Sequence, residues 1–246
     1  MKTVLTFLSG IIPLPILRKI FLNILGHDVS YNSKLGINIL LIKKIQLKKG
    51  SKLGHFNFIK INELLLDEEA FIKSFNYLKG PFTFKLGPKS GISRQNKIRR
   101  SYSPISYGYS CLELGKNSFI VSNHLLDLTR SIKIGNDSII AGTNSQLWTH
   151  GYYHDNKGSE RIRIDGQVII GNNVYIGSGC IFNPGVKVLD AIHIGAGSVI
   201  SKNLEESGMY VSQGLRFIRN DIDNLKSRLK KVDDRNLVEE VYTKNG

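Results

Sequence analysis

An apolar residue recurs at every sixth position along most of this chain of 246 residues. Helices repeat every 3.6 residues and strands every 2, so neither accounts for a period of six. Glycine directly follows several of these positions, as in Leu53-Gly54 and Ile176-Gly177, and it tolerates the dihedral angles of a sharp corner. The positions are Val29, Leu35, Leu41, Leu47, Leu53, Ile59, Leu65, Phe71 and Tyr77, then Leu86, Ile92 and Ile98, then Leu114, Ile120 and Leu126, then Ile134 and Ile140, and finally Ile170, Ile176, Phe182, Val188, Ile194 and Ile200.

A six-residue unit that points one aliphatic side chain inward and then turns a corner predicts a solenoid. Three units close a triangular coil, and successive coils pair as short parallel strands, so each inward side chain sits on the one eighteen residues earlier. A series of β-hairpins would instead require alternation at period two, which these segments do not sustain. The sequence therefore predicts an all-β solenoid over residues 29–204, with a helical cap at 1–28 and a C-terminal extension at 205–246.

The N-terminal segment, MKTVLTFLSGIIPLPILRKIFLNIL, is uncharged from Thr3 to Leu17 and resembles the core of a signal peptide. It lacks a small-x-small cleavage site, and Arg18 and Lys19 follow too early for a span of roughly 20 apolar residues. We predict a short helix that begins near Pro15. This helix either caps the end of the core or rests on a membrane surface.

Basic residues dominate the charge of the chain: 34 Lys and Arg against 20 Asp and Glu give a formal net charge of +14. This balance favours partners that carry phosphate, carboxylate or an anionic bilayer surface. Nucleic acid is not an expected partner, because no zinc-finger, RNP or helix-turn-helix pattern is visible. The basic cluster RQNKIRR at 94–100 either attracts an anionic acceptor or lipid phosphates, or is a solvated charge run. Cys111 and Cys180 form no Cys-x-x-Cys pair, which favours a reduced, cytoplasmic chain.

The repeat is interrupted between Gln146 and Ile164. Residues 149–163 are polar, aromatic and glycine-containing, which predicts an excursion loop that leaves the solenoid and carries reactive groups. The loop holds His150 and His154 and directly follows Trp148, the only tryptophan. Histidine is the usual general base for removing a proton from a hydroxyl, because its pKa lies near neutral pH.

The segment IGNNVYIGSGCIFNPGVKVLDAIHIGAGSVISKN, residues 170–203, resembles the hexapeptide-repeat signature of the left-handed β-helix acyltransferases. That family includes galactoside, maltose and serine acetyltransferases. Within it, this chain most resembles the O-acetyltransferases that modify bacterial surface polysaccharides. The resemblance implies a left-handed parallel β-helix, a homotrimer with active sites between subunits, and acetyl-CoA as the acetyl donor.

The resemblance also implies roles for residues of the interruption. His150, in WTHG, is similar to the catalytic histidine of the galactoside and maltose enzymes, and Asp155 is a candidate for orienting an imidazole. His154 is the rival base, with contact to the substrate as its expected role, and Trp148 is a further candidate for substrate contact.

Acceptor binding is implied for the segment VSNHLLDLTRSIKIG, residues 121–135, which resembles the stretch with which sugar acetyltransferases hold their acceptor. Asn123 and Asp127 would then hydrogen-bond sugar hydroxyls. A second interpretation is that both residues satisfy backbone groups at a corner of the solenoid.

Donor binding is implied for the later coils. Ser178 in IGSG and Ala196 in IGAG match small positions along which the family binds pantetheine, and the amide near Ser178 is a candidate oxyanion donor. Ser201 and Lys202 take the place of a threonine-lysine pair in the family, and Arg216 takes the place of a basic residue near the C-terminal end. The resemblance implies that these residues contact the phosphates of coenzyme A. The sequence VSQGLRF replaces the usual Gly-Val-Pro, so solvated surface is an equal interpretation for Arg216.

The C-terminal extension has apolar residues at helical spacing, which predicts an amphipathic helix of about four turns that covers the end of the solenoid or packs around a trimer axis. The residues with this spacing are Ile218, Ile222, Leu225, Leu229 and Val232.

The expected function is an acetyl-CoA-dependent O-acetyltransferase that modifies a saccharide hydroxyl of a surface polysaccharide or its precursor, by direct transfer and without a metal. The enzyme is expected in the cytoplasm or peripherally at the inner face of the membrane. Three alternatives remain open. One is an amino-sugar N-acetyltransferase, and another is a non-catalytic glycan-binding subunit. The third is a γ-type carbonic anhydrase, which holds zinc on three histidines across a subunit boundary, with His124, His150 and His154 as the candidate ligands.

Overall fold

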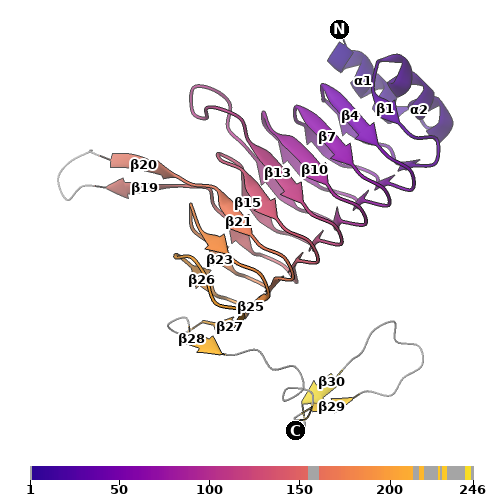
Figure 1. Ribbon diagram of the computed structural model, residues 1–246. Helices are drawn as coiled ribbons and strands as arrows, with labels where there is room; N and C mark the ends of the chain where they lie inside the picture. The colour runs from indigo at the N-terminus through magenta and orange to yellow at the C-terminus, as the bar shows by residue number, and fades with distance from the viewer. Residues whose placement is uncertain are drawn as a thin grey trace.

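Three parallel sheets wrap around one apolar core and form a solenoid (Figure 1). The computed structural model describes residues 2–154, 161–212, 216–218, 227, 229–231 and 242–244. The chain visits the three sheets in turn, so each strand pairs with the strands one coil earlier and one coil later. The predicted fold class, a left-handed parallel β-helix, is confirmed.

The sheets are named here A, B and C in the order in which the chain visits them. Sheet A contains β1 (Asp28–Val29), β4 (Lys44–Leu47), β7 (Glu63–Leu66), β10 (Thr83–Leu86), β13 (Cys111–Leu114), β16 (Ile132–Ile134), β21 (Val168–Ile170) and β24 (Lys187–Val188). Sheet B contains β2 (Lys34–Leu35), β5 (Lys52–Leu53), β8 (Phe71–Ile72), β11 (Gly91–Ile92), β14 (Phe119–Ile120), β17 (Ile139–Ile140), β22 (Tyr175–Ile176), β25 (Ile192–Ile194), β27 (Gly208–Val211) and β28 (Arg216–Ile218). Sheet C contains β3 (Ile39–Leu40), β6 (Phe58–Lys60), β9 (Tyr77–Lys79), β12 (Lys97–Arg99), β15 (Leu125–Asp127), β18 (Gln146–Leu147), β23 (Ile181–Phe182) and β26 (Val199–Ile200).

The period of six holds strictly in only some coils. Ile170 pairs with Val188, one coil of eighteen residues later. Other coils are longer because a corner holds an additional residue, as at Phe56, whose φ of 59° lies in the left-handed region. The predicted inward frame is therefore wrong at Leu41, Leu65, Phe71 and Tyr77, and the core there contains Leu40, Leu66, Ile72 and Leu78.

A ladder of buried amides lines the corner between sheets B and C. The Oδ1 atoms of Asn38, Asn57 and Asn76 each accept a hydrogen bond from the backbone N–H of the next asparagine, at 2.9, 2.9 and 3.0 Å. Asn96 Oδ1 continues the ladder to the backbone N–H of His124 at 3.0 Å. These bonds satisfy backbone donors that the corner removes from water.

Two helices, α1 (Lys2–Ile11) and α2 (Pro15–Ile24), cover the N-terminal end of the solenoid (Figure 1). The predicted helix near Pro15 is α2, with proline in its first turn, where no backbone N–H is needed. The sequence analysis missed α1, which is packed so closely that a Cβ on Gly10 would lie 2.6 Å from Asn38 O. None of the helices in the described residues is long and apolar enough to cross a membrane.

Between β18 and β21 the chain leaves the solenoid as an antiparallel hairpin of β19 (His150–His154) and β20 (Arg161–Asp165), which projects from the coils (Figure 1). The excursion predicted at 149–163 is therefore present, but its described part is a two-stranded ribbon rather than a loop. The candidate Asp155 lies outside the described residues.

The C-terminal end differs from the expectation. Parallel pairing continues past residue 204, because β27 pairs with β25, and β28 then folds back antiparallel on β27. The amphipathic helix expected over 218–232 lies mostly outside the described residues. Residue 227 is helical, but the prediction is wrong at Ile218, which is in β28, and at Leu229, because β29 (Leu229–Lys231) pairs with β30 (Tyr242–Lys244). A neighbouring strand, not the next helical turn, takes their backbone hydrogen bonds.

Candidate active site

His150 lies where the hairpin leaves the solenoid, at the corner between sheets C and A. It is the first residue of β19 and follows the last sheet C strand before the excursion. Its Nδ1 atom lies 2.8 Å from Oδ2 of Asp127, which ends β15 one coil earlier. The His150 side chain is 27% exposed and that of Asp127 13% exposed, so the pair is sheltered while the imidazole remains reachable.

Two threonines hold the Asp127 carboxylate in place. The Thr149 hydroxyl lies 2.8 Å from Oδ2, and the Thr149 backbone N–H donates to the same oxygen at 3.2 Å. Thr129 contributes a hydroxyl 3.2 Å from Oδ1 and a backbone N–H 3.4 Å from Oδ2. A carboxylate fixed in this way accepts a hydrogen bond from the Nδ1–H group of His150. The proton then stays on Nδ1, and the Nε2 lone pair is available as a base.

Aromatic rings flank the imidazole on both sides. The rings of Trp148 and Tyr152 each have centroids 6.1 Å from that of His150, with interplanar angles of 78° and 89°. The Trp148 indole donates to Gln146 Oε1 at 3.0 Å, which fixes its orientation. These edge contacts restrict rotation of the imidazole and surround it with apolar surface.

An arginine clamps the base of the hairpin. Arg163 Nε and Nη2 donate to the two Asp165 carboxylate oxygens at 2.7 and 2.9 Å, and Nη1 donates to Ile105 O at 2.6 Å. The hydrogen bond to Asp165 raises the pKa of Arg163 above its ordinary value. Because Asp165 is paired in register with His150, the clamp ties the His150 end of the hairpin to the segment at 101–110.

The sequence analysis missed Thr129, Thr149, Arg163 and Asp165. The segment at 101–110 is a second excursion from the solenoid, and Arg130 stacks over its Tyr107 ring at 5.0 Å. The break in the six-residue frame between Ile98 and Leu114 was the available signal for it. Its contact with the hairpin could not be read from that break.

His154 and Asn123 are not brought to His150. His154 ends β19 and pairs with Arg161, so its backbone lies at the opposite end of the ribbon. Asn123 lies at the corner between sheets B and C, before the start of β15, whereas His150 lies beyond the end of β18. The φ of Asn123 is 61°, and its Nδ2 donates to Asn144 Oδ1 at 2.7 Å. The interpretation of Asn123 as a corner residue agrees with this geometry.

His124 belongs to the buried ladder rather than to the surface. It is 1% exposed, and its Nδ1 accepts the Ser145 backbone N–H at 3.1 Å. Burial lowers the pKa of His124 to about 4. His124 and His150 lie at opposite edges of sheet C, and the part of the chain that the structure describes contains no group of three His, Cys, Asp or Glu side chains placed to hold a metal. Within one chain, His124 is therefore not placed to share a zinc ion with His150.

The expected donor residues occupy positions away from His150 within one chain. Ser178 and Ala196 are exposed at the corner between sheets B and C in successive coils, with Ser178 Oγ 3.4 Å from Thr143 N. Ser201 and Lys202 follow β26 and are exposed. The backbone of Arg216 pairs with Val211, and its side chain lies outside the described residues.

The sequence of the chain is 31% identical to the galactoside O-acetyltransferase of Escherichia coli over 119 residues, which are 47% of this chain and 58% of the relative. The chain thus matches less than two thirds of the length of this curated relative. No protein-family model matches the chain.

Two solved structures are similar to the solenoid. A galactoside acetyltransferase in complex with coenzyme A is 27% identical, with a TM-score of 0.42, and the match covers 52% of this chain and 62% of that chain. A polySia-specific acetyltransferase is 19% identical, with a TM-score of 0.47 and coverage of 79% and 80%. The resemblance to hexapeptide-repeat acetyltransferases predicted from the repeats is confirmed by the sequence relative and the parallel solenoid.

Proposed function

We propose that this chain, whose sequence relatives are acetyltransferases, transfers an acetyl group from acetyl-CoA to a hydroxyl of a saccharide. The acceptor class is a surface polysaccharide or its precursor. The observation that carries the proposal is the hydrogen bond of 2.8 Å between His150 Nδ1 and Asp127 Oδ2 at the base of the hairpin. This pair supplies an oriented, partly exposed base, which direct acyl transfer to a hydroxyl requires.

In the proposed reaction, His150 Nε2 removes the proton of the acceptor hydroxyl as the oxygen attacks the thioester carbonyl. The carbon–sulfur bond then breaks, the thiolate leaves with the bonding electron pair, and the proton on Nε2 passes to it. Asp127 keeps its position on Nδ1 throughout and stabilises the imidazolium form. The role we propose for Asp127 is therefore to position the imidazole, in place of the sugar contact expected from the sequence.

A second copy of the chain is part of this proposal. The Ser178–Ala196 corner lies where the strands of sheet C begin, and His150 lies where they end. One chain therefore does not bring the base and the donor positions together. A homotrimer, as the resemblance implies, places the donor corner of one subunit beside the His150 corner of its neighbour. Ser178, Ala196, Ser201 and Lys202 are then the proposed contacts to coenzyme A, and the amide near Ser178 is the proposed oxyanion donor.

The test is release of free thiol from acetyl-CoA in the presence of a panel of saccharides and amino sugars. His150→Ala should lower the acceptor-dependent rate by two to four orders of magnitude. His55→Ala, which removes an exposed imidazole elsewhere on the solenoid, is the matched control and should retain the rate.

Three results would contradict the proposal or refine it. Full activity of His150→Ala would refute the assignment of the base. Transfer only to amino groups would favour an amino-sugar N-acetyltransferase, which uses the same groups. Saccharide binding without any acetyl transfer would support a non-catalytic binding subunit.

A further inference from the structure

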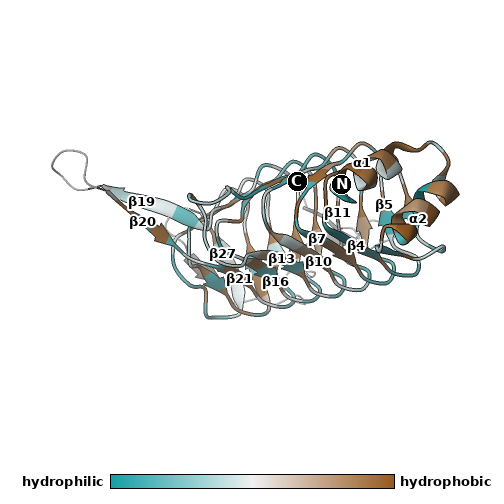
Figure 2. Cartoon of the chain, turned by 90° about the horizontal axis from the view of Figure 1, so that it is seen from above, coloured by the Kyte–Doolittle hydropathy of each residue, from teal (hydrophilic) through white to brown (hydrophobic). Residues whose placement is uncertain are grey.

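The two N-terminal helices bury their polar residues and expose their apolar ones. Helix α1 buries Thr6, Ser9 and Gly10, and α2 buries Arg18 and Lys19 beside Leu22. A surface helix of a globular protein normally turns its apolar face toward the core. The exposed apolar residues are Val4, Leu5, Leu8 and Ile11 on α1, and Ile16, Leu17, Phe21 and Ile24 on α2. Figure 2 shows both helices as a predominantly hydrophobic end of the molecule.

Hydrogen bonds fix this inverted orientation. Thr6 Oγ1 lies 3.0 Å from His27 Nε2, and His27 Nδ1 accepts the Ile45 backbone N–H at 3.2 Å. Lys19 Nζ donates to the carbonyl oxygens of Tyr31 and Ser33 at 2.8 and 2.5 Å. Rotation of either helix to bury its apolar face would break these buried bonds, and each unsatisfied group would cost about 1–3 kcal/mol.

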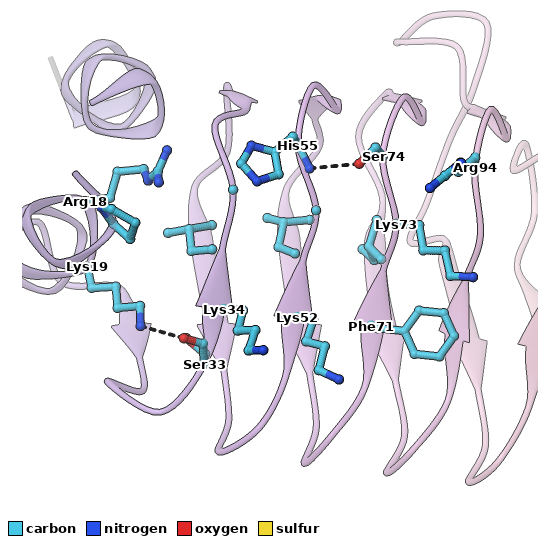
Figure 3. Close-up of a pocket in the computed structure, with 16 residues that line it drawn as sticks. Arg18, Lys19, Ser33, Lys34, Lys52, His55, Phe71, Lys73, Ser74 and Arg94 are labelled. Atoms are coloured by element: carbon cyan, nitrogen blue, oxygen red, sulfur yellow. Dashed lines mark hydrogen bonds between the residues drawn. The ribbon is translucent and has the colours of Figure 1, made fainter. Parts of the chain in front are cut away.

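A basic cavity opens next to the inner side of α2. It has a volume of about 810 Å³ and extends from α2 across the first coils of sheet B (Figure 3). Its cationic side chains are Arg18, Lys19, Lys34, Lys52, Lys73 and Arg94, and no Asp or Glu lines it. The cavity therefore carries a concentrated positive charge directly beside the apolar helix surface.

Arg18 gives the cavity a specific preference. It is 1% exposed, and its Nε and Nη1 atoms have no hydrogen-bond partner among the described residues. Burial lowers the pKa of Arg18 below its ordinary value. Arg18 lines the cavity, and its guanidinium offers a planar fork of donors that matches the oxygens of a phosphate, so it is the group in the cavity best suited to bind an oxyanion.

We propose that α1, α2 and this cavity form a docking surface for a bilayer that contains anionic phospholipids. The exposed apolar side chains of both helices enter the boundary between headgroups and acyl chains, and the headgroup phosphate of one lipid binds at Arg18. Each helix has 10 residues, about 15 Å, a length suited to lying along the interface. The apolar face and the basic cavity adjoin the same helix, α2, so exposed apolar side chains and positive charge complementary to an anionic membrane lie at the same end of the molecule.

Vesicle flotation with the full-length chain tests the proposal. The protein should float with vesicles of phosphatidylcholine and phosphatidylglycerol in equal amounts, and much less with phosphatidylcholine alone. Added salt should weaken the binding. Equal flotation with both vesicles, or none with either, would overturn the proposal. Binding of soluble inorganic pyrophosphate without any flotation would also overturn it, because it would assign the cavity to a free phosphate compound.

Paired variants separate the two parts of the surface. Leu8→Ser, at a side chain 48% exposed on α1, should weaken flotation several-fold, whereas Leu189→Ser, at one 49% exposed near β24, should not.

Lys34→Gln with Lys52→Gln should lower binding to anionic vesicles by roughly tenfold or more, because each lysine near such a surface contributes about a fivefold factor. The matched pair Lys133→Gln with Lys187→Gln, exposed on sheet A, should leave binding unchanged. Equal losses in test and control pairs would refute the assignment of the surface. None of these measurements depends on transferase activity.

Discussion

Asp127 Oδ2 lies 2.8 Å from His150 Nδ1, although the two residues are 23 positions apart in the sequence. They meet because β15 and β18 are paired neighbours in sheet C, with Leu126 beside Leu147. Asp127 ends its strand there, and the chain reaches His150 soon after the paired strand. The stacking of coils therefore creates the pair, which no local motif contains.

The first prediction concerns this pair. Asp127→Asn keeps the size of the side chain but replaces the carboxylate with an amide, which no longer favours the Nδ1-protonated imidazole. We expect kcat for acetyl transfer to fall by about two to four orders of magnitude with a small change in KM. Asp137→Asn, at an exposed corner where the carboxylate contacts Asn117 Nδ2 at 3.0 Å, is the control. Similar losses for both variants would refute a specific role of Asp127.

The second prediction concerns Thr149, a buried residue whose hydroxyl lies 2.8 Å from Asp127 Oδ2 and accepts the Arg130 backbone N–H at 2.9 Å. Thr149→Val retains the shape but removes the hydroxyl, which leaves that N–H without its partner. We expect the free energy of unfolding to fall by about 1–3 kcal/mol and kcat to fall as well. Thr149→Ser restores the hydroxyl and should recover most of kcat. If serine failed to rescue the rate, the hydrogen bond would not be the cause.

The third prediction concerns pH. Burial lowers the pKa of His124 to about 4 from an ordinary value of 6.5, so the unfolded chain takes up this proton at a higher pH than the folded chain. The free energy of unfolding therefore has its full value above pH 6.5 and falls as the pH drops from 6.5 to 4, by a total on the order of 3 kcal/mol for this histidine. We call this decrease with falling pH the slope. The pKa of His27 is lowered to about 4 for the same main reason, burial, and it adds to the same slope.

Denaturant unfolding between pH 7 and pH 4 measures this slope. His124→Asn continues the asparagine ladder without a titrating group and should make the dependence of the free energy of unfolding on pH shallower. His27 and His193, whose pKa values are also lowered by burial, contribute to what remains. His55→Asn, at an exposed position, is the control and should leave the slope unchanged. An unaltered slope in His124→Asn would show that the buried imidazole is not the group responsible.

The fourth prediction concerns the stability of the N-terminal cap in the absence of lipid. Arg18 is buried with two unpartnered nitrogens, so its desolvation is not compensated within the described residues. Arg18→Met should raise the free energy of unfolding by about 1–4 kcal/mol, measured by thermal or denaturant unfolding without vesicles. The same variant should bind anionic vesicles less well. A large loss of stability would mean that the guanidinium is already satisfied in the free protein.

Much of the fold was predictable because a solenoid is built from local repeats. The aliphatic period identified the coils, the proline at position 15 marked the start of α2, and the interruption after Gln146 located the hairpin. Helix α1 escaped prediction because its buried face is polar, which reverses the pattern on which sequence analysis depends. The inward frame near Leu65 and Phe71 was wrong because corners absorb single additional residues, and apolar side chains on neighbouring positions hide the shift.

The sequence by itself determined the stacked architecture and pointed to His150, because both depend on residues close together along the chain. Only the tertiary structure decided that Asp127 faces this imidazole, that His124 is sealed inside the ladder, and that the apolar sides of α1 and α2 face outward. The physical reason is that these relationships depend on how neighbouring coils align and on which polar groups find partners when water is removed. Such pairings are properties of the packed molecule, and a linear pattern does not contain them.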